Sequence, residues 1–165
     1  MRRKHSLQIP LLITIFLAIT LLLLLLLPSN ADKASATVDE FYQLEQQANY
    51  SAAWELFHQE MQERFSKDNY IIDRTDLVVN QFGTDTFTYS LSKPEKVENW
   101  KMTADSKPLT AYKIIATLTL VGKYGHFDYV QYIYVTKVDK EWKILWDYKN
   151  LMASRLTSFV TLLVR

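Results

Sequence analysis

The sequence predicts an α+β protein: an N-terminal membrane helix, then about three helices packed on a curved antiparallel sheet. Three observations predict this class. Residues 11–27 are apolar or hydroxyl-bearing and carry no charge. Apolar residues between 37 and 82 recur at helical intervals. From residue 84 onward the apolar period changes to two, which is typical of strands.

The apolar run is the strongest single feature. Extended back through Pro10, residues 7–27 provide enough positions to cross a bilayer. Arg2, Arg3 and Lys4 form a dense basic cluster beside it, and such clusters stay on the cytoplasmic side. We therefore predict a single-pass protein of the cell membrane whose C-terminal domain is extracytoplasmic.

A cleaved export signal is the alternative reading. Ser29-Asn30-Ala31 has the small-x-small pattern of a cleavage site, and Pro28 would end the preceding helix. The chain would then be secreted after cleavage behind Ala31. The sequence contains no cysteine, which excludes a lipid anchor on that residue.

Composition suggests four segments. We expect an anchor or signal at 1–28, a small polar linker at 29–36, one domain at 37–150 and an apolar tail at 151–165. The net charge of +1 implies no nucleic-acid partner. Without cysteines the domain has no disulfides and must be stabilised by side-chain packing. The chain contains ten Tyr, eight Phe and four Trp that can form a hydrophobic core.

Three helices are expected in the first half of the domain, with Thr37, Ser51 and Ser66 as their N-caps. The second helix carries one apolar stripe, formed by Trp54, Phe57, Met61 and Phe65. The third presents Ile71, Ile72, Val78, Val79 and Phe82 to the core and ends at Gly83.

The second half of the domain reads as strands. Period-two alternation predicts them near 86–90, 96–102, 111–121, 127–138 and 141–148. Asp139-Lys140 is a two-residue connection, so the last three strands form an antiparallel meander.

Three stretches of the chain together resemble a known superfamily over about residues 35–150. They are 38–42 (VDEFY) with 49–54 (NYSAAW), 64–66 (RFS) leading into the third helix, and 141–147 (EWKILWD). This pattern resembles the nuclear transport factor 2-like superfamily, also called cystatin-like. The last stretch is similar to the closing strand of the non-catalytic N-terminal domain of resistance-type penicillin-binding proteins. The resemblance implies a cone-shaped fold with a pocket between helices and sheet, and an extracytoplasmic setting.

Candidate site residues are few. Asp128, Tyr132 and Tyr134 share one face of a strand and are pocket candidates, because such a row could polarise a carbonyl group. Tyrosines in this arrangement are more often packing residues. We assign no catalytic residue, no metal ligand and no cofactor.

Two aromatic residues are candidates for partner binding. Trp100 stands among Glu98, Asn99 and Lys101 on a weak strand, and exposed aromatics often anchor partners. Phe159 belongs to the apolar tail, for which a helix is favoured and a strand over 157–164 stays open.

These features predict a membrane-tethered, extracytoplasmic binding or scaffold domain of the bacterial cell envelope, more consistent with a non-enzymatic role. Its partners would be the membrane, through residues 7–27, and an envelope protein or a second copy of the chain. The alternatives are a small extracytoplasmic enzyme with a ketosteroid-isomerase-like pocket, and a scaffold subunit of a conjugation or secretion machine.

Overall fold

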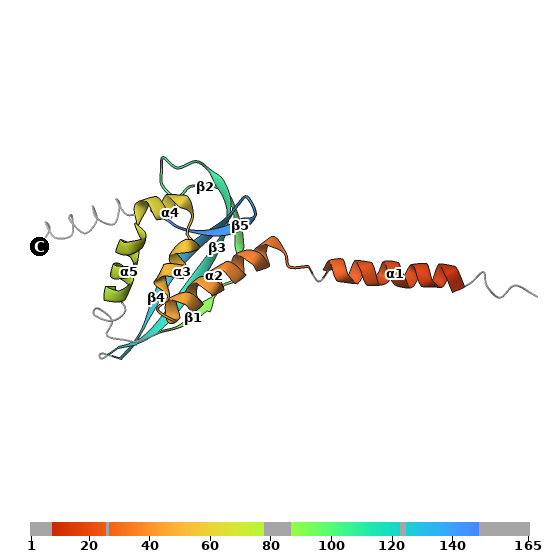
Figure 1. The fold of residues 1–165 in the computed structure, drawn as a ribbon, viewed down its shortest axis with the longest axis horizontal. Coiled ribbons are helices and arrows are strands. Elements are labelled where there is room, and N and C mark those ends of the chain that lie inside the picture. The colour runs from red at the N-terminus through yellow and green to blue at the C-terminus, as the bar shows by residue number, and fades with distance from the viewer. Residues whose placement is uncertain (1–7, 26, 78–86, 123–124, 149–165) are drawn as a thin grey trace, which may run out of the picture.

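The computed structural model describes residues 8–25, 27–77, 87–122 and 125–148 (Figure 1). Its elements in chain order are α1 (Gln8–Leu25), α2 (Asn30–Gln46), α3 (Tyr50–Glu55), α4 (Gln59–Arg64), α5 (Lys67–Thr75), β1 (Phe87–Leu91), β2 (Glu95–Trp100), β3 (Leu109–Gly122), β4 (Gly125–Val138) and β5 (Glu141–Trp146). Helices followed by an antiparallel sheet confirm the predicted α+β class.

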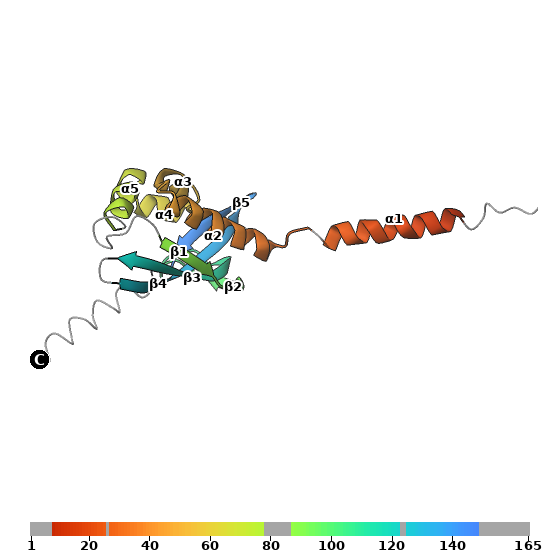
Figure 2. The ribbon, with the colours of Figure 1, turned by 90° about the horizontal axis from the view of Figure 1, so that it is seen from below.

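Helix α1 extends away from the other elements (Figures 1 and 2). Its apolar side chains are exposed all around, as Leu12, Phe16, Leu17 and Leu21 illustrate. Within the described residues, no helix combines the length and the apolar character needed to cross a membrane.

Helix α2 begins earlier than predicted. Ser29 is its N-cap and forms a reciprocal capping box with Asp32, so the expected linker at 29–36 is instead the start of this helix. Thr37, the predicted cap, lies inside the helix, where its hydroxyl donates to the carbonyl oxygen of Lys33. The correction has a local cause, since Ser29 with Asp32 has the same capping spacing as Thr37 with Glu40.

The predicted second helix is two short helices. Asn49, not Ser51, caps α3, and His58 caps α4. Between them the chain is extended at Phe57, which forms a parallel bridge with Ile144 of β5. The Ile144 amide donates to Leu56 O at 2.8 Å and the His58 amide donates to Ile144 O at 2.9 Å. This pairing with a distant strand interrupts the helical pattern.

Helix α5 begins as predicted, with Ser66 as its N-cap and Asp68 in the first turn. Its buried residue is Tyr70, whereas Ile72, which was expected in the core, is 64% exposed. The part of the predicted helix from Val78 to Gly83 lies outside the described residues.

The sheet has the order β1-β3-β4-β5, and β2 also pairs with β3. All pairings are antiparallel. Strand β1 lies beside residues 116–120 of β3, and β2 lies beside residues 109–113. The predicted meander of β3, β4 and β5 is confirmed, including its two-residue connection, where Asp139 has a φ of 55°.

Helices α2 to α5 lie on one side of the sheet (Figure 2). Because side chains alternate along a strand, the face toward the helices is set by Tyr42 of α2, whose hydroxyl bonds Gln131 of β4. The odd-numbered residues of β4 therefore face the helices and the even-numbered ones face away. The main core forms on the helix side, from Phe41, Phe57, Met61, Ile114, Leu118, Leu120 and Ile133.

A smaller cluster covers part of the opposite face. Trp100 is only 4% exposed, and its ring stacks on Tyr134 at 4.2 Å. Leu145, paired with Tyr134, is also buried there. The expectation of a partly exposed Trp100 is thus corrected: the register of β2 shifts between Val97 and Trp100, which turns the indole inward.

Candidate binding pocket

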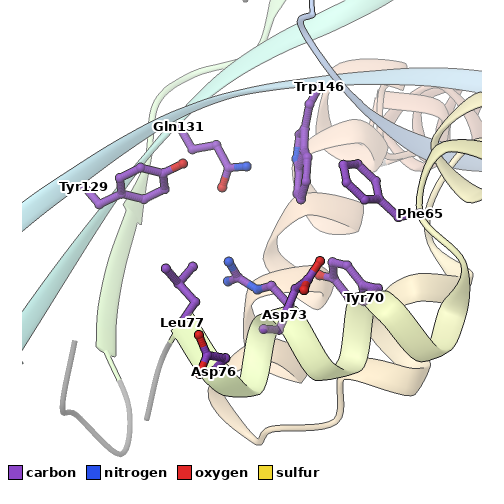
Figure 3. A pocket seen from close by; sticks show the side chains of 9 residues that line it. Phe65, Tyr70, Asp73, Asp76, Leu77, Tyr129, Gln131 and Trp146 are labelled. Atoms are coloured by element: carbon purple, nitrogen blue, oxygen red, sulfur yellow. The ribbon is translucent and has the colours of Figure 1, made fainter. Parts of the chain in front are cut away.

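A cavity of about 390 Å³ opens between α5 and the first half of β4. Figure 3 shows Tyr129 and Gln131 on the sheet side, with Tyr70, Asp73, Asp76 and Leu77 across from them. Trp146 and Phe65 complete the wall, and Arg74 also lines it. The lining thus combines four aromatic residues and one leucine with four polar or charged residues.

A buried ion pair lies beside the cavity. Glu45 of α2 accepts from the Arg74 guanidinium through Nε at 2.6 Å and through Nη2, and from the Tyr70 hydroxyl at 2.5 Å. The Glu45 side chain is fully buried and that of Arg74 is 12% exposed. Three donors on one carboxylate satisfy the buried charge and join α2 to α5.

Burial also determines how these groups ionise. Burial alone would lower the pKa of Arg74, but the Glu45 carboxylate outweighs it and raises that pKa. Burial, reinforced by the charge of Glu45, raises the pKa of the Tyr70 hydroxyl far above its ordinary value. Tyr70 therefore stays a hydrogen-bond donor to Glu45 and is not available as a proton donor in the cavity.

The wall of the cavity across from α5 presents two N–H donors, the amide of Gln131 and the indole of Trp146. Gln131 uses its carbonyl oxygen to accept from Tyr42 at 3.0 Å, which leaves its amide nitrogen directed elsewhere. The Trp146 Nε1 atom is buried, and its indole nitrogen lies on the side of the ring that faces Gln131 (Figure 3). Within the described residues the Trp146 indole N–H has no hydrogen-bond acceptor. The pair could bind one acceptor atom of a ligand.

Trp146 is held in place by its neighbours. Phe57 and Phe65 meet its ring edge-on at centroid distances of 5.2 and 6.0 Å. The indole donor is therefore fixed before any ligand arrives.

A second hollow of about 270 Å³ adjoins the cavity. It is lined by the consecutive residues 129–132 of β4 and 146–148 of the chain leaving β5. Tyr148 forms one side, with the Arg64 guanidinium 3.9 Å from its ring centroid. We call this hollow the edge slot, because it lies where β4 and β5 separate.

Charge limits what the cavity can hold. The carboxylate of Asp73 lines it, while the charge of Arg74 is balanced by Glu45. Negative charge is therefore in excess, which disfavours an anion and favours a neutral, planar group with a hydrogen-bond acceptor. Among the described residues, no three His, Cys, Asp or Glu side chains gather as metal ligands.

The sequence-predicted pocket residues do not meet in this cavity. Asp128 accepts from the Thr119 hydroxyl at 2.6 Å and is exposed, and Tyr134 is stacked on Trp100. Tyr132 lines the edge slot and not the cavity. Alternation correctly put the three on one face, but that face is turned away from the helices. Phe159 lies outside the described residues.

Sequence reasoning missed Glu45, Arg74, Tyr70, Gln131 and Trp146. One signal could have found the first of them. Glu45 lies at helical spacing from Val38, Phe41 and Tyr42, and a charge in an apolar stripe indicates a buried partner.

The sequence reading also overlooked that Ser90 and Lys93 have the Ser-x-x-Lys spacing of penicillin-binding enzymes. Ser90 lies on β1 and is exposed. It does not line either hollow. Nothing in this placement points to a nucleophile.

No known protein family has a model that matches the chain, and no curated protein is similar enough to count as a relative.

Proposed function

We propose that the chain is a membrane-tethered, extracytoplasmic binding domain that uses the cavity between α5 and β4 and has no catalytic role. Membership of the nuclear transport factor 2-like superfamily is part of the proposal. The order of helices and strands and the position of the cavity between the two layers support it.

The tether is the segment 7–27. Its sequence is free of charge, and the described residues of α1 carry exposed apolar side chains on all sides. A helix that is apolar all around needs apolar surroundings. Two residues of the proposed span, Leu7 and Leu26, belong to the parts that the structure does not describe.

One observation carries the binding role: the Trp146 indole N–H, which has no acceptor among the described residues, and the Gln131 amide both lie in the wall of the cavity. The fitting ligand is a neutral, planar group with a carbonyl-type acceptor. The enzyme alternative would need an acid or base aimed at that acceptor. The buried hydroxyl of Tyr70 is already engaged with Glu45, and the carboxylates of Asp73 on α5 and Asp76 at its C-cap lie across the cavity from the two donors.

The tether is tested in cells that express the full chain. We expect the protein to stay with membranes after alkaline extraction, and protease added outside intact cells to digest the domain. Leu17→Arg should weaken retention and Leu17→Ile should not, because a charge in a bilayer is costly. A chain released by alkali, or a domain protected in intact cells, would refute the tether.

The cavity is tested with benzamide, a neutral planar carbonyl compound, and with benzoate as its anionic counterpart. We expect benzamide to shift the Trp146 indole N–H resonance and benzoate to leave it in place. Leu77→Phe fills the cavity and should abolish the shift, whereas Ile72→Phe changes an exposed residue of the same helix and should preserve it. An unshifted indole resonance at saturating benzamide would disprove this ligand class.

A further inference from the structure

Burial along β4 changes abruptly at one position. Strand β3 pairs with the whole of β4, but β5 pairs only from Ile133 onward. Residues 133–136 are buried. Just before them, Tyr129, Val130 and Tyr132 are 43%, 48% and 50% exposed. The exposed half of β4 is therefore the half that has no strand on its outer side in the described part of the chain.

The exposure affects both faces of the strand. Tyr129 points to the helix side, whereas Val130 and Tyr132 point to the opposite side. A missing helix would uncover one face only. Exposure on both faces at consecutive residues indicates that the missing neighbour is a strand in the plane of the sheet. Within the described residues no strand pairs with the outer side of residues 125–132, and an unpaired sheet edge is a template for strand addition.

The chain itself turns away from this edge. Continued pairing of β5 would bring Tyr148 opposite Gln131, but the Tyr148 amide donates to Met102 O at 3.0 Å. The edge slot opens at this divergence, between residues 129–132 and 146–148. The slot is thus an entry point for an extended segment beside β4.

We propose that residues 157–164 of the same chain add to β4 as a further strand beside residues 125–132. The two stretches have the same length. Residues 149–156, which connect the slot to this segment, can span about 26 Å at about 3.3 Å per residue, enough to reach the edge. The inference is independent of the ligand proposed for the cavity.

The sequence of the segment fits the edge. Residues 157–164 (TSFVTLLV) carry apolar residues on both alternating faces and no charge, as expected for a strand covered on both sides.

A cysteine scan tests the placement, because the natural chain has no cysteine to interfere. Val130→Cys is combined with one cysteine at each position from 157 to 164, and the full chain is oxidised in detergent micelles. We expect a disulfide at the position directly opposite Val130, a weaker one two residues away on the same face, and none at the position between them, since side chains alternate along a strand and a disulfide needs Cα atoms within about 7 Å. Thr88→Cys on β1, across β3 from this edge, is the matched control and should form none.

Three results of the scan would overturn the proposal. Disulfides at every third or fourth position would mean a docked helix. A disulfide-linked dimer of the Val130→Cys single variant would mean that a second copy occupies the edge. Absence of any intramolecular disulfide would mean that the segment lies elsewhere, for example against the micelle.

Amide hydrogen exchange gives a second test without introduced cysteines. Alternate amides between Gly125 and Tyr132 should be protected in the full chain, and they should exchange faster after truncation behind Tyr148. The amides of residues 133–136 serve as the folding control for the truncated protein. Equal exchange at the edge in both folded proteins would refute the added strand; if the truncated protein does not fold, the scan in the full chain decides.

Discussion

Arg74 and Glu45 form a buried ion pair that joins α5 to α2 beside the cavity. Removing one partner of such a pair leaves an uncompensated charge in the interior, which costs about 3–5 kcal/mol. We therefore expect Arg74→Leu and Glu45→Leu each to lower the free energy of unfolding by that amount, and the double variant to recover most of the loss.

Chemical denaturation of the three variants measures this prediction. The exposed pair Lys67–Glu55 is the control, and Lys67→Ala should cost less than about 1 kcal/mol. Single variants of the buried pair that lose no more than the control would show that the pair contributes little.

Stability should fall as the pH drops below about 6.5 because of His58. Burial lowers the pKa of this imidazole, so the folded protein binds its proton less readily than the unfolded chain. The loss begins near the unfolded pKa and ends when the pH reaches the lower folded pKa. The His58 Nδ1 atom accepts from the Glu60 amide and caps α4, so protonation of that atom would also remove the cap.

His58→Asn keeps a cap acceptor that does not titrate. Its denaturation midpoint should lack the decline that the natural protein shows below about pH 6.5. Identical pH profiles for the two proteins would assign the decline to other groups.

Trp100→Ala should cost about 3–5 kcal/mol, because the indole is buried and stacked on Tyr134. Tyr132→Ala, at a half-exposed position on the same face, should cost less than about 1 kcal/mol. Thermal denaturation followed by circular dichroism compares the two. A small effect at Trp100 would favour the exposed, partner-binding role that its sequence context suggested.

The mature chain should keep its first residues, without cleavage behind Ala31. Ser29 caps α2 and exchanges hydrogen bonds with Asp32, so cleavage would remove the cap and cut inside the first turn of a helix. Mass spectrometry of the intact protein from membranes tests this. A mature chain that starts at Asp32 would contradict it and would mean secretion.

The sequence predicted best what is decided locally. The cap at Ser66 and the period-two strands were correct, because caps and alternation depend on neighbouring residues. The break at Phe57 could not be predicted, since the bridge to Ile144 connects residues far apart in the chain and overrides a regular apolar stripe.

The residues of the candidate site were harder to predict than the fold, because tertiary contacts bring them together. Alternation placed Asp128, Tyr132 and Tyr134 on one face but could not tell which face the helices cover. Arg74 meets Glu45 only because α5 folds back beside α2. The one local sign of this hydrogen-bonded group was Glu45, a charged residue in the apolar stripe of α2.

The break between α3 and α4 also guards the protein against aggregation. At Ile144, the outward amide and carbonyl of β5 are both bonded, to Leu56 and His58. This part of β5 therefore cannot template a strand from another molecule, although its sequence EWKILW is rich in β-forming residues. A substitution that fused α3 and α4 into one continuous helix would leave the amide and carbonyl of Ile144 unpaired. We expect such a variant to associate through this strand edge.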